Sequence, residues 1–213
     1  MNKLKSISTK LGNEIKLIGD EHAKVLIIGV FHGDEPQGKF LIEEYLKHNS
    51  TENLLFIPCL NPDGMKLKQR TNANGVDLNR NFPTKNWGED GSEAGSKKED
   101  YYGGSAPASE TETQFLTDTI NEFKPELILT LHAPYKVVNY DGPAEKIAEI
   151  ISDIINYPVE ASIGYPTPGS FGTYAGVERN IATITLELDE DCPVENLVEP
   201  VNKIFDEIKR AVN

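Results

Sequence analysis

The stretch VLIIGVFHGDEPQG (residues 25–38) joins two kinds of sequence without a linker. Its first half is an apolar run with little alternation, which is typical of a strand covered on both faces of a sheet. Its second half places His32 and Glu35, three residues apart, directly after that run. Both residue types bind metal ions, but two ligands do not make a site. The other ligands have to come from elsewhere in the chain.

The rest of the chain alternates short β-type runs with amphipathic stretches. Strands are predicted at residues 14–19, 24–31, 53–60, 126–132 and 182–188, and helices at residues 36–47, 110–122, 143–155 and 194–212. Such alternation is typical of layered α/β domains. We therefore expect one domain over residues 1–213, built on a mixed, largely parallel sheet flanked by helices.

Two local patterns add detail to this fold. Ser109 and Glu112 have the spacing of a capping box at the start of the second predicted helix. Residues 83–108, in contrast, are rich in Gly, Ser and charged residues and show no periodicity. We expect this segment to form a long, partly mobile surface loop.

Composition and charge exclude several classes of function. The 213 residues include 34 acidic residues and 21 Lys or Arg, which gives a formal charge of −13. A phosphate-binding surface needs clustered positive charge, so neither nucleic acid nor an anionic membrane is an expected partner. No apolar run approaches the roughly 18 residues of a membrane span, and the N-terminal segment lacks the apolar core of a signal peptide. The expected location is the cytoplasm, which also suits the two isolated cysteines, Cys59 and Cys192.

Metal-binding residue types follow three of the predicted strands. His32 and Glu35 follow the first, His132 ends the run ELILTLH, and Glu187 follows ATITL. In open α/β sheets, ligands bind just beyond the carboxyl ends of the strands. Two imidazoles and one carboxylate around an open position form a common catalytic zinc site, and a further Glu supplies a general base. Each residue alone is typical of an ordinary strand end, but the joint pattern predicts zinc chemistry.

A polar segment, RTNANGVDLNRNFP (residues 70–83), carries Arg70, Asp77, Asn79 and Arg80. An Arg with a neighbouring Asn can bind a carboxylate through two contacts. A separate Arg can stabilise the oxyanion of a tetrahedral intermediate. An Asn-rich turn without a function has a similar sequence. The segment therefore indicates substrate binding only in combination with the metal-binding residue types at the strand ends.

Together these segments resemble the zinc metallocarboxypeptidase family. The resemblance rests on HGDE, NPDG, GVDLNRNF, a later His and TLEL, at residues 32–35, 61–64, 75–82, 132 and 185–188, which stand in the family's order. It implies a hydrolase with one zinc ion per chain, bound by His32, Glu35 and His132.

The same resemblance implies roles for the other polar residues. Glu187 is expected to be the general base, and Arg70 to polarise the scissile carbonyl. Asn79 and Arg80 are expected to hold the free C-terminal carboxylate of a small peptide substrate. Asp77 is expected to orient a zinc-binding histidine from behind.

One loop narrows the resemblance further. The family carries a loop Tyr 22 residues before the base, and Tyr165 stands 22 residues before Glu187, in the segment YPTPGS. This segment resembles a bacterial branch that hydrolyses the γ-D-glutamyl–meso-diaminopimelate bond of murein tripeptides in cell-wall recycling. Tyr165 is then expected to close over the substrate. Pro134 stands where digestive members have a Tyr, so their substrate contacts do not transfer to that position.

Three alternatives stay open. A general metallocarboxypeptidase shares all these parts. An N-acyl amino acid deacylase of the aspartoacylase type also has H-x-x-E, a later His and DLNR, although YPTPGS followed by TLEL speaks against it. A non-enzymatic zinc-binding module needs neither Glu187 nor Arg70, so the presence of both argues against that class. The oligomeric state is not indicated by the sequence.

Overall fold

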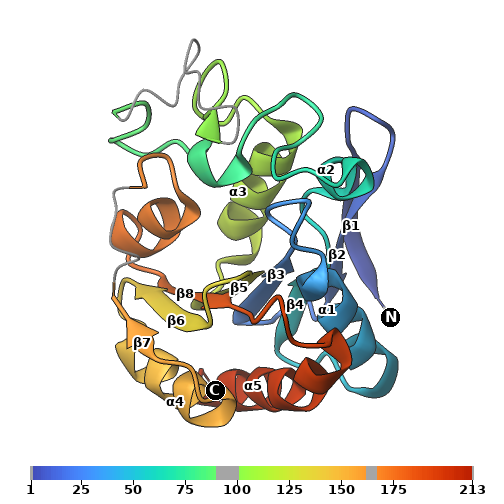
Figure 1. The fold of residues 1–213 in the computed structure, drawn as a ribbon, viewed down its shortest axis with the longest axis vertical. Coiled ribbons are helices and arrows are strands. Elements are labelled where there is room, and N and C mark those ends of the chain that lie inside the picture. The colour runs from blue at the N-terminus through green and yellow to red at the C-terminus, as the bar shows by residue number, and fades with distance from the viewer. Residues whose placement is uncertain (1, 90–100, 162–166, 213) are drawn as a thin grey trace.

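An eight-stranded sheet forms the centre of the structure, a computed structural model that describes residues 2–89, 101–161 and 167–212 (Figure 1). The strands are β1 (Lys3–Ser8), β2 (Glu14–Gly19), β3 (Val25–Gly29), β4 (Leu54–Ile57), β5 (Leu127–His132), β6 (Val137–Asp141), β7 (Val159–Glu160) and β8 (Ala182–Glu187). The α-helices are α1 (Gln37–His48), α2 (Pro62–Leu67), α3 (Thr111–Phe123), α4 (Glu145–Ile155) and α5 (Val198–Ala211). A 3-10 turn at Val194–Leu197 leads into α5, and a π-helical turn, η3, spans Thr173–Val177.

The sheet is mixed, with the strand order β1-β2-β4-β3-β5-β8-β6-β7. The four strands in its middle, β4, β3, β5 and β8, run parallel to one another. On either side, β2 and β6 are antiparallel to the parallel group, and β1 is antiparallel to β2. The predicted α/β fold with a mixed sheet flanked by helices is therefore confirmed.

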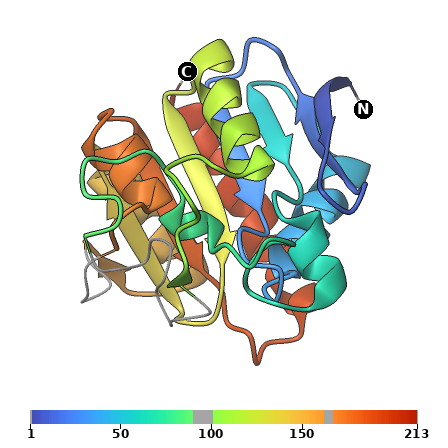
Figure 2. The same ribbon diagram turned by 90° about the horizontal axis from the view of Figure 1, so that it is seen from above.

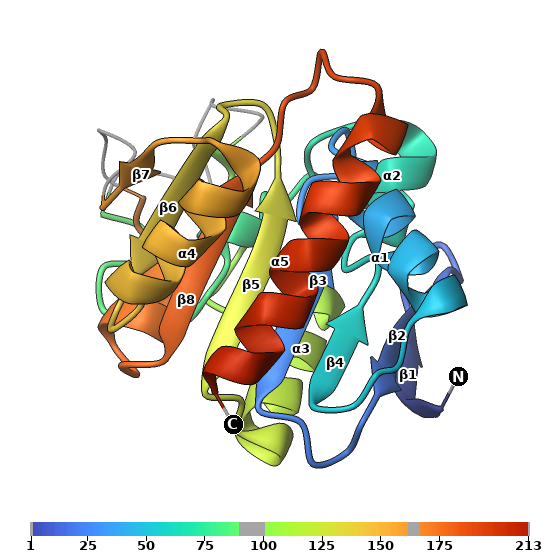
Figure 3. The ribbon, with the colours of Figure 1, turned by 90° about the horizontal axis from the view of Figure 1, so that it is seen from below.

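Both faces of the central strands are covered, which explains their apolar sequences. Successive side chains of a strand point to opposite faces. Val25 and Ile27 accordingly belong to a core cluster with side chains of α1, α4 and α5, whereas Leu26 and Ile28 belong to a second cluster with side chains of α3 and the η3 region. Figure 2 shows α3 in front of one face of the sheet, and Figure 3 shows α1, α4 and α5 across the other.

Some elements differ from the sequence predictions. The predictions omitted α2 and the strands β1, β6 and β7. The capping box was also wrong, because α3 is capped at Glu110 and its cap makes no side-chain hydrogen bond. The Ser109 hydroxyl instead donates to Glu110 Oε1 at 2.6 Å, and Glu112 Oε2 accepts from Asn72 Nδ2 at 3.3 Å. Both residues of the predicted box therefore have other partners, and neither side chain caps α3.

The described parts of the predicted loop fold back onto the segment after α2. Asp77 N donates to Tyr102 O at 2.8 Å, and Asn81 Nδ2 donates to Gly103 O at 2.7 Å. Ala108 N donates to Asn81 O at 2.6 Å. Residues 90–100, the middle of the predicted loop, lie outside the described residues. None of the helices in the described parts of the chain is long and apolar enough to cross a membrane.

Candidate active site

Three neighbouring parallel strands bring the predicted site residues to one edge of the sheet. His132 is the last residue of β5, Glu187 is the last residue of β8, and the two are register partners. His32 lies three residues beyond β3, which pairs with β5 on its other side. All three side chains are buried, with exposed fractions of 3% for His32, 4% for His132 and 8% for Glu187.

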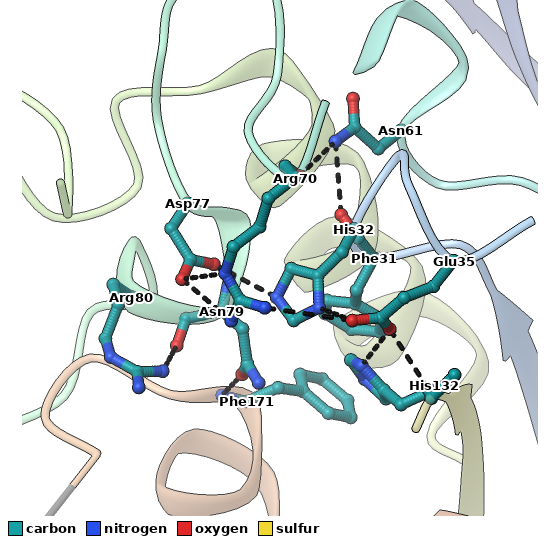
Figure 4. A network of polar contacts seen from close by, with 11 residues as sticks. Phe31, His32, Glu35, Asn61, Arg70, Asp77, Asn79, Arg80, His132 and Phe171 are labelled. Carbon is teal, nitrogen blue, oxygen red and sulfur yellow. Dashed lines mark hydrogen bonds and ion pairs between the residues drawn. The ribbon is translucent and has the colours of Figure 1, made fainter. Parts of the chain in front are cut away.

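The turn that presents His32 depends on its backbone and on the NPDG segment. Val30 has a φ of 58°, in the left-handed region that β-branched residues rarely adopt, and its carbonyl accepts from Asn61 N at 2.9 Å. Gly33 packs directly on Gly64, because a Cβ at residue 33 would lie 2.0 Å from the Gly64 carbonyl carbon. The Asn61 side chain also reaches the carbonyls of Phe31 and Arg70 (Figure 4). HGDE and NPDG therefore form one packed unit.

Glu35 joins the two histidines. Its Oε1 lies 2.7 Å from His32 Nδ1, and its Oε2 lies 3.1 Å from His132 Nδ1 (Figure 4). One ligand atom from each of the three residues can be chosen so that all lie within 4.8 Å of one another. Two donors bonded to one zinc ion at about 2 Å stand up to roughly 4 Å apart. The donor set of two imidazoles and one carboxylate fits a single zinc site, and its atoms would have to approach from within 4.8 Å to that spacing to hold the ion.

Asp77 lies on the other side of His32. Its Oδ1 is 3.2 Å from His32 Nε2 and accepts from Asn79 N at 2.8 Å, while its Oδ2 accepts from Arg70 Nε and a terminal guanidinium nitrogen, both at 3.2 Å. Burial alone would raise the pKa of the Asp77 carboxyl, but His32 and Arg70 outweigh burial and hold it well below its usual range. Asp77 is fully buried and ionised, so it fixes both the imidazole ring and the guanidinium group.

Electrostatics at the centre match a cation-binding position. Burial lowers the pKa of His32, but the carboxylates of Glu35 and Asp77 outweigh burial and raise it to about 9. Burial would raise the pKa of the Glu35 carboxyl, but its contacts with the two histidines, chiefly with His32, outweigh burial and lower this pKa. The two carboxylates thus create a strongly negative environment in which positive charge is favoured.

A cavity of about 410 Å³ opens beside these residues. Arg70, Asn79 and Arg80 line it together with the His–Glu–His group and Glu187. The Asn79 amide oxygen accepts from Phe171 N at 2.8 Å, and a terminal nitrogen of Arg80 donates to Asn79 O at 2.8 Å. Arg80 is only 3% exposed, and its buried Nε has no partner among the described residues. Because Arg80 lines the cavity and pairs with no carboxylate among the described residues, its guanidinium is placed to meet an anionic ligand.

Glu187 has the environment of a proton acceptor. Its Oε2 is buried and has no hydrogen-bond partner among the described residues. Burial raises the pKa of the Glu187 carboxyl, and the negative charge of Glu35 adds to this effect, although the two histidines oppose it. A carboxyl with a raised pKa in a cavity that also holds a metal-ligand set is suited to general acid–base work.

The structure brings together all the predicted site residues that it describes, and it adds polar residues of the cavity that the sequence reasoning missed. Tyr165 lies outside the described residues. Tyr101, Asn139 and Asp141 also line the cavity. Asn139 and Asp141 are two residues apart on β6, the spacing that places side chains on one face of a strand. That polar alternation was the available signal, whereas no local pattern distinguishes Tyr101.

Comparisons with known proteins agree with this geometry. A family model described as zinc carboxypeptidase matches residues 8–149. Murein peptide amidase A of Escherichia coli K12 is 35% identical over 170 residues, which span 76% of this chain and 69% of that protein. Murein peptide amidase A of Vibrio campbellii is 34% identical over 184 residues, which span 79% of this chain and 71% of that protein.

Solved structures show the same fold. The crystal structure of murein-tripeptide amidase from Escherichia coli O157 superposes with a TM-score of 0.80 at 28% identity, over 95% of this chain and 89% of that one. Thrombin activatable fibrinolysis inhibitor superposes with a TM-score of 0.73 at 18% identity, over 98% of this chain and 70% of that one. The second likeness bears on the fold alone.

Proposed function

The chain belongs to the zinc carboxypeptidase family of hydrolytic metallopeptidases, and within this family we propose that it cleaves the γ-D-glutamyl–meso-diaminopimelate bond of murein tripeptides. The products are L-Ala-D-Glu and free diaminopimelate. The observation that carries the proposal is the single cavity that joins the His–Glu–His group to Glu187, Arg70, Asn79 and Arg80. The likeness to two murein peptide amidases supports the choice of substrate.

His32, Glu35 and His132 are proposed to hold one zinc ion per chain. When bound, zinc supplies a Lewis acid that polarises a carbonyl group and lowers the pKa of water. Asp77 supports the site from behind, because its contact with His32 Nε2 orients the ring so that Nδ1 faces the metal position.

Glu187 is proposed to be the general base. The Glu187 carboxylate, whose Oε2 has no partner among the described residues, accepts a proton from the attacking water and later delivers it to the nitrogen of the leaving amine. The C–N bond of the substrate breaks in this second step, so that the amine departs neutral. Burial keeps the pKa of Glu187 above that of an exposed carboxyl, which favours the return of the proton.

The two arginines are proposed to bind different parts of the substrate. Arg70 directs Nε and one terminal nitrogen to Asp77, while its other terminal nitrogen lies 3.7 Å from Glu35 Oε1, beside the metal position. That nitrogen can donate to the oxyanion that develops on the scissile carbonyl. Arg80 and Asn79 bind the free α-carboxylate of the leaving residue. Tyr165 is proposed to close over the bound peptide, as the family resemblance implies.

Asp141 supports diaminopimelate as the leaving residue. Its carboxyl lines the cavity, is partly buried and makes no hydrogen bond or ion pair among the described residues. Diaminopimelate carries a second ammonium group at the far end of its side chain, which can neutralise such a carboxylate. An ordinary apolar leaving residue would leave the Asp141 carboxylate without a partner.

The proposal also includes the place of the reaction in the cell. We assign it to the cytoplasm and to the recycling of cell-wall peptides, where a tripeptide is split so that its amino acids can be reused. Cys59 and Cys192 are both free thiols, in keeping with a reducing compartment.

One assay separates this function from its alternatives. Purified protein is incubated with L-Ala-γ-D-Glu-meso-diaminopimelate, with matched α-linked dipeptides and with N-acetyl amino acids, and the products are identified by mass. We expect the tripeptide to have the highest kcat/KM. Faster cleavage of α-linked peptides would favour a general carboxypeptidase, and faster cleavage of N-acetyl amino acids would favour a deacylase. No hydrolysis of any substrate by zinc-loaded protein would favour a binding module.

A further inference from the structure

Tyr101 touches both arginines of the cavity. The guanidinium carbon of Arg70 lies 5.3 Å from the centre of the Tyr101 ring, and that of Arg80 lies 5.5 Å from it. Both distances are within the roughly 6 Å at which a cation is attracted to an aromatic face. Tyr101 lines the same cavity and is 39% exposed. One aromatic ring therefore contacts two cations to which we assign different tasks.

The backbone around Tyr101 is held by the segment that carries these arginines. Asp77 N donates to the carbonyl of Tyr102 at 2.8 Å, and Asn81 Nδ2 donates to the carbonyl of Gly103 at 2.7 Å. Trp87 Nε1 donates to the same Gly103 carbonyl at 3.2 Å. These contacts fix Tyr101 relative to the arginine segment.

The two arginines differ in how their charges are balanced. Arg70 forms an ion pair with Asp77 at 3.2 Å. Arg80 has no carboxylate within ion-pair distance among the described residues, and its described hydrogen bond goes to the uncharged carbonyl of Asn79. A buried guanidinium without a carboxylate requires other stabilisation while the cavity holds no substrate.

We propose that Tyr101 is a positioning residue that holds Arg80 in place for the substrate carboxylate while keeping its charge available. This inference rests on the proposed function, because it takes Arg80 as the carboxylate-binding group. The electron-rich face of the ring attracts the guanidinium without neutralising it. A carboxylate at residue 101 would hold Arg80 equally well but would compete with the substrate for the same charge. The contact with Arg70 places the same ring against the neighbouring cation and fixes the spacing of the two.

Substitutions at residue 101 separate the effect of the aromatic ring from the effects of the hydroxyl group and of an added charge. We expect Y101L to raise KM about threefold to tenfold for a peptide with a free α-carboxylate, as expected for the loss of a partly desolvated cation–π contact. Y101F keeps the ring and should restore most of the affinity. Y101E should raise KM more than Y101L does, since it adds a competing charge. Y102L is the matched control, because the Tyr102 ring makes no cation–π contact in the described part of the chain.

The corresponding peptide amide makes the test specific. Without a terminal carboxylate, the amide should be processed with nearly the same KM by Y101L and the unaltered protein. An equal rise in KM for acid and amide would overturn the inference, as would wild-type KM values in Y101L. A Y101F variant as weak as Y101L would also overturn it, because the hydroxyl and not the ring would then matter. Thermal unfolding of each variant shows whether the fold is retained.

A second measurement is independent of the substrate. The guanidinium NMR signals of Arg70 and Arg80, assigned with R70K and R80K, should move in Y101L and stay in place in Y101F, because an aromatic ring shifts nearby nuclei. If the tripeptide is not hydrolysed but these signals move as expected, the proposed substrate is wrong and the positioning contact stands. If the signals do not move in Y101L, the positioning role is wrong whatever the substrate.

Discussion

His132 and Glu187 are register partners on the adjacent parallel strands β5 and β8. Partners in register project to the same face of a sheet, so a ligand-type imidazole and a carboxylate with one unpartnered oxygen meet at the cavity without help from loops. A slip of one residue in β8 would turn Glu187 to the opposite face. The register of the sheet itself therefore places a proposed metal ligand, His132, beside the proposed general base, Glu187.

The first prediction separates the base from the metal. Glu187→Gln keeps the size of the side chain but removes its ability to accept a proton. We expect kcat to fall at least about a hundredfold, the lower end of general-base contributions, with zinc content unchanged. Kinetics on the tripeptide and elemental analysis of the same preparation measure both quantities. A folded variant with near-normal kcat would place the base elsewhere.

The second prediction concerns the metal ligands. His132→Ala removes one of three donors and leaves Glu35 with a single histidine partner. We expect the purified variant to lose most of its zinc after dialysis, while the unaltered protein retains about one ion per chain. His48→Ala at the exposed end of α1 is the control and should retain zinc. Equal zinc content in His132→Ala and the unaltered protein would refute the assigned ligand set.

The site residues at the edge of the sheet could be predicted because the strands that carry them are recognisable from local sequence. Apolar runs that end in His32, His132 and Glu187 predict covered strands, and covered parallel strands deliver their carboxyl ends to one edge. The structure confirms β3, β5 and β8 as adjacent parallel strands. Asp77 was placed by family resemblance alone, since no pattern indicates that it reaches His32 Nε2 from 45 residues away.

Other features depend on contacts between distant segments. β6 was missed because its sequence, VVNYD, has only two clearly apolar residues and carries the cavity groups Asn139 and Asp141. Ser109 was expected to cap α3, but Asn81 holds its hydroxyl through a hydrogen bond of 3.1 Å. Tyr101 belonged to a segment predicted as a surface loop, although its backbone neighbours bind the arginine segment.

A third prediction concerns stability and pH. Asp63 is fully buried and accepts hydrogen bonds from Thr9 Oγ1 and Asn13 Nδ2, both at 2.6 Å, and from Leu11 N at 2.9 Å. Although burial opposes it, these bonds lower the pKa of the Asp63 carboxyl. Asp63→Asn leaves a donor unsatisfied, so we expect a loss of about 1–3 kcal/mol in the free energy of unfolding at pH 7.

The sign of the pH effect follows from that lowered pKa. A group whose pKa is lower in the folded protein stabilises it above the unfolded pKa of about 3.9 and loses this contribution as the pH falls further. The difference between the unaltered protein and Asp63→Asn should be constant above about pH 5 and shrink below about pH 4. Urea unfolding at several pH values measures it. A difference that grows on acidification would contradict the assignment.

The last prediction concerns the choice of leaving residue. Burial raises the pKa of the Asp141 carboxyl, which has no partner among the described residues, and a cation bound beside it in the cavity would favour its ionised form. Asp141→Asn keeps the size of the side chain and removes the charge that would pair with the distal ammonium of diaminopimelate. We expect kcat/KM for the tripeptide to fall about tenfold or more, as for the loss of a partly buried charged hydrogen bond. L-Ala-γ-D-Glu-L-Ala, which lacks the ammonium group, should change by less than about twofold, because it never formed that bond.

Glu190 provides the matched control for this last prediction, because it lines the same cavity but is exposed. Water and salt screen an exposed carboxylate, so Glu190→Gln should change kcat/KM for either tripeptide only slightly. The measurement is the ratio of the two kcat/KM values in each variant. Asp141 shapes specificity if the ratio collapses in Asp141→Asn and persists in Glu190→Gln. If Asp141→Asn lowers kcat/KM equally for both tripeptides, Asp141 supports the cavity but does not recognise the leaving residue. The preference for diaminopimelate would then have to come from other groups.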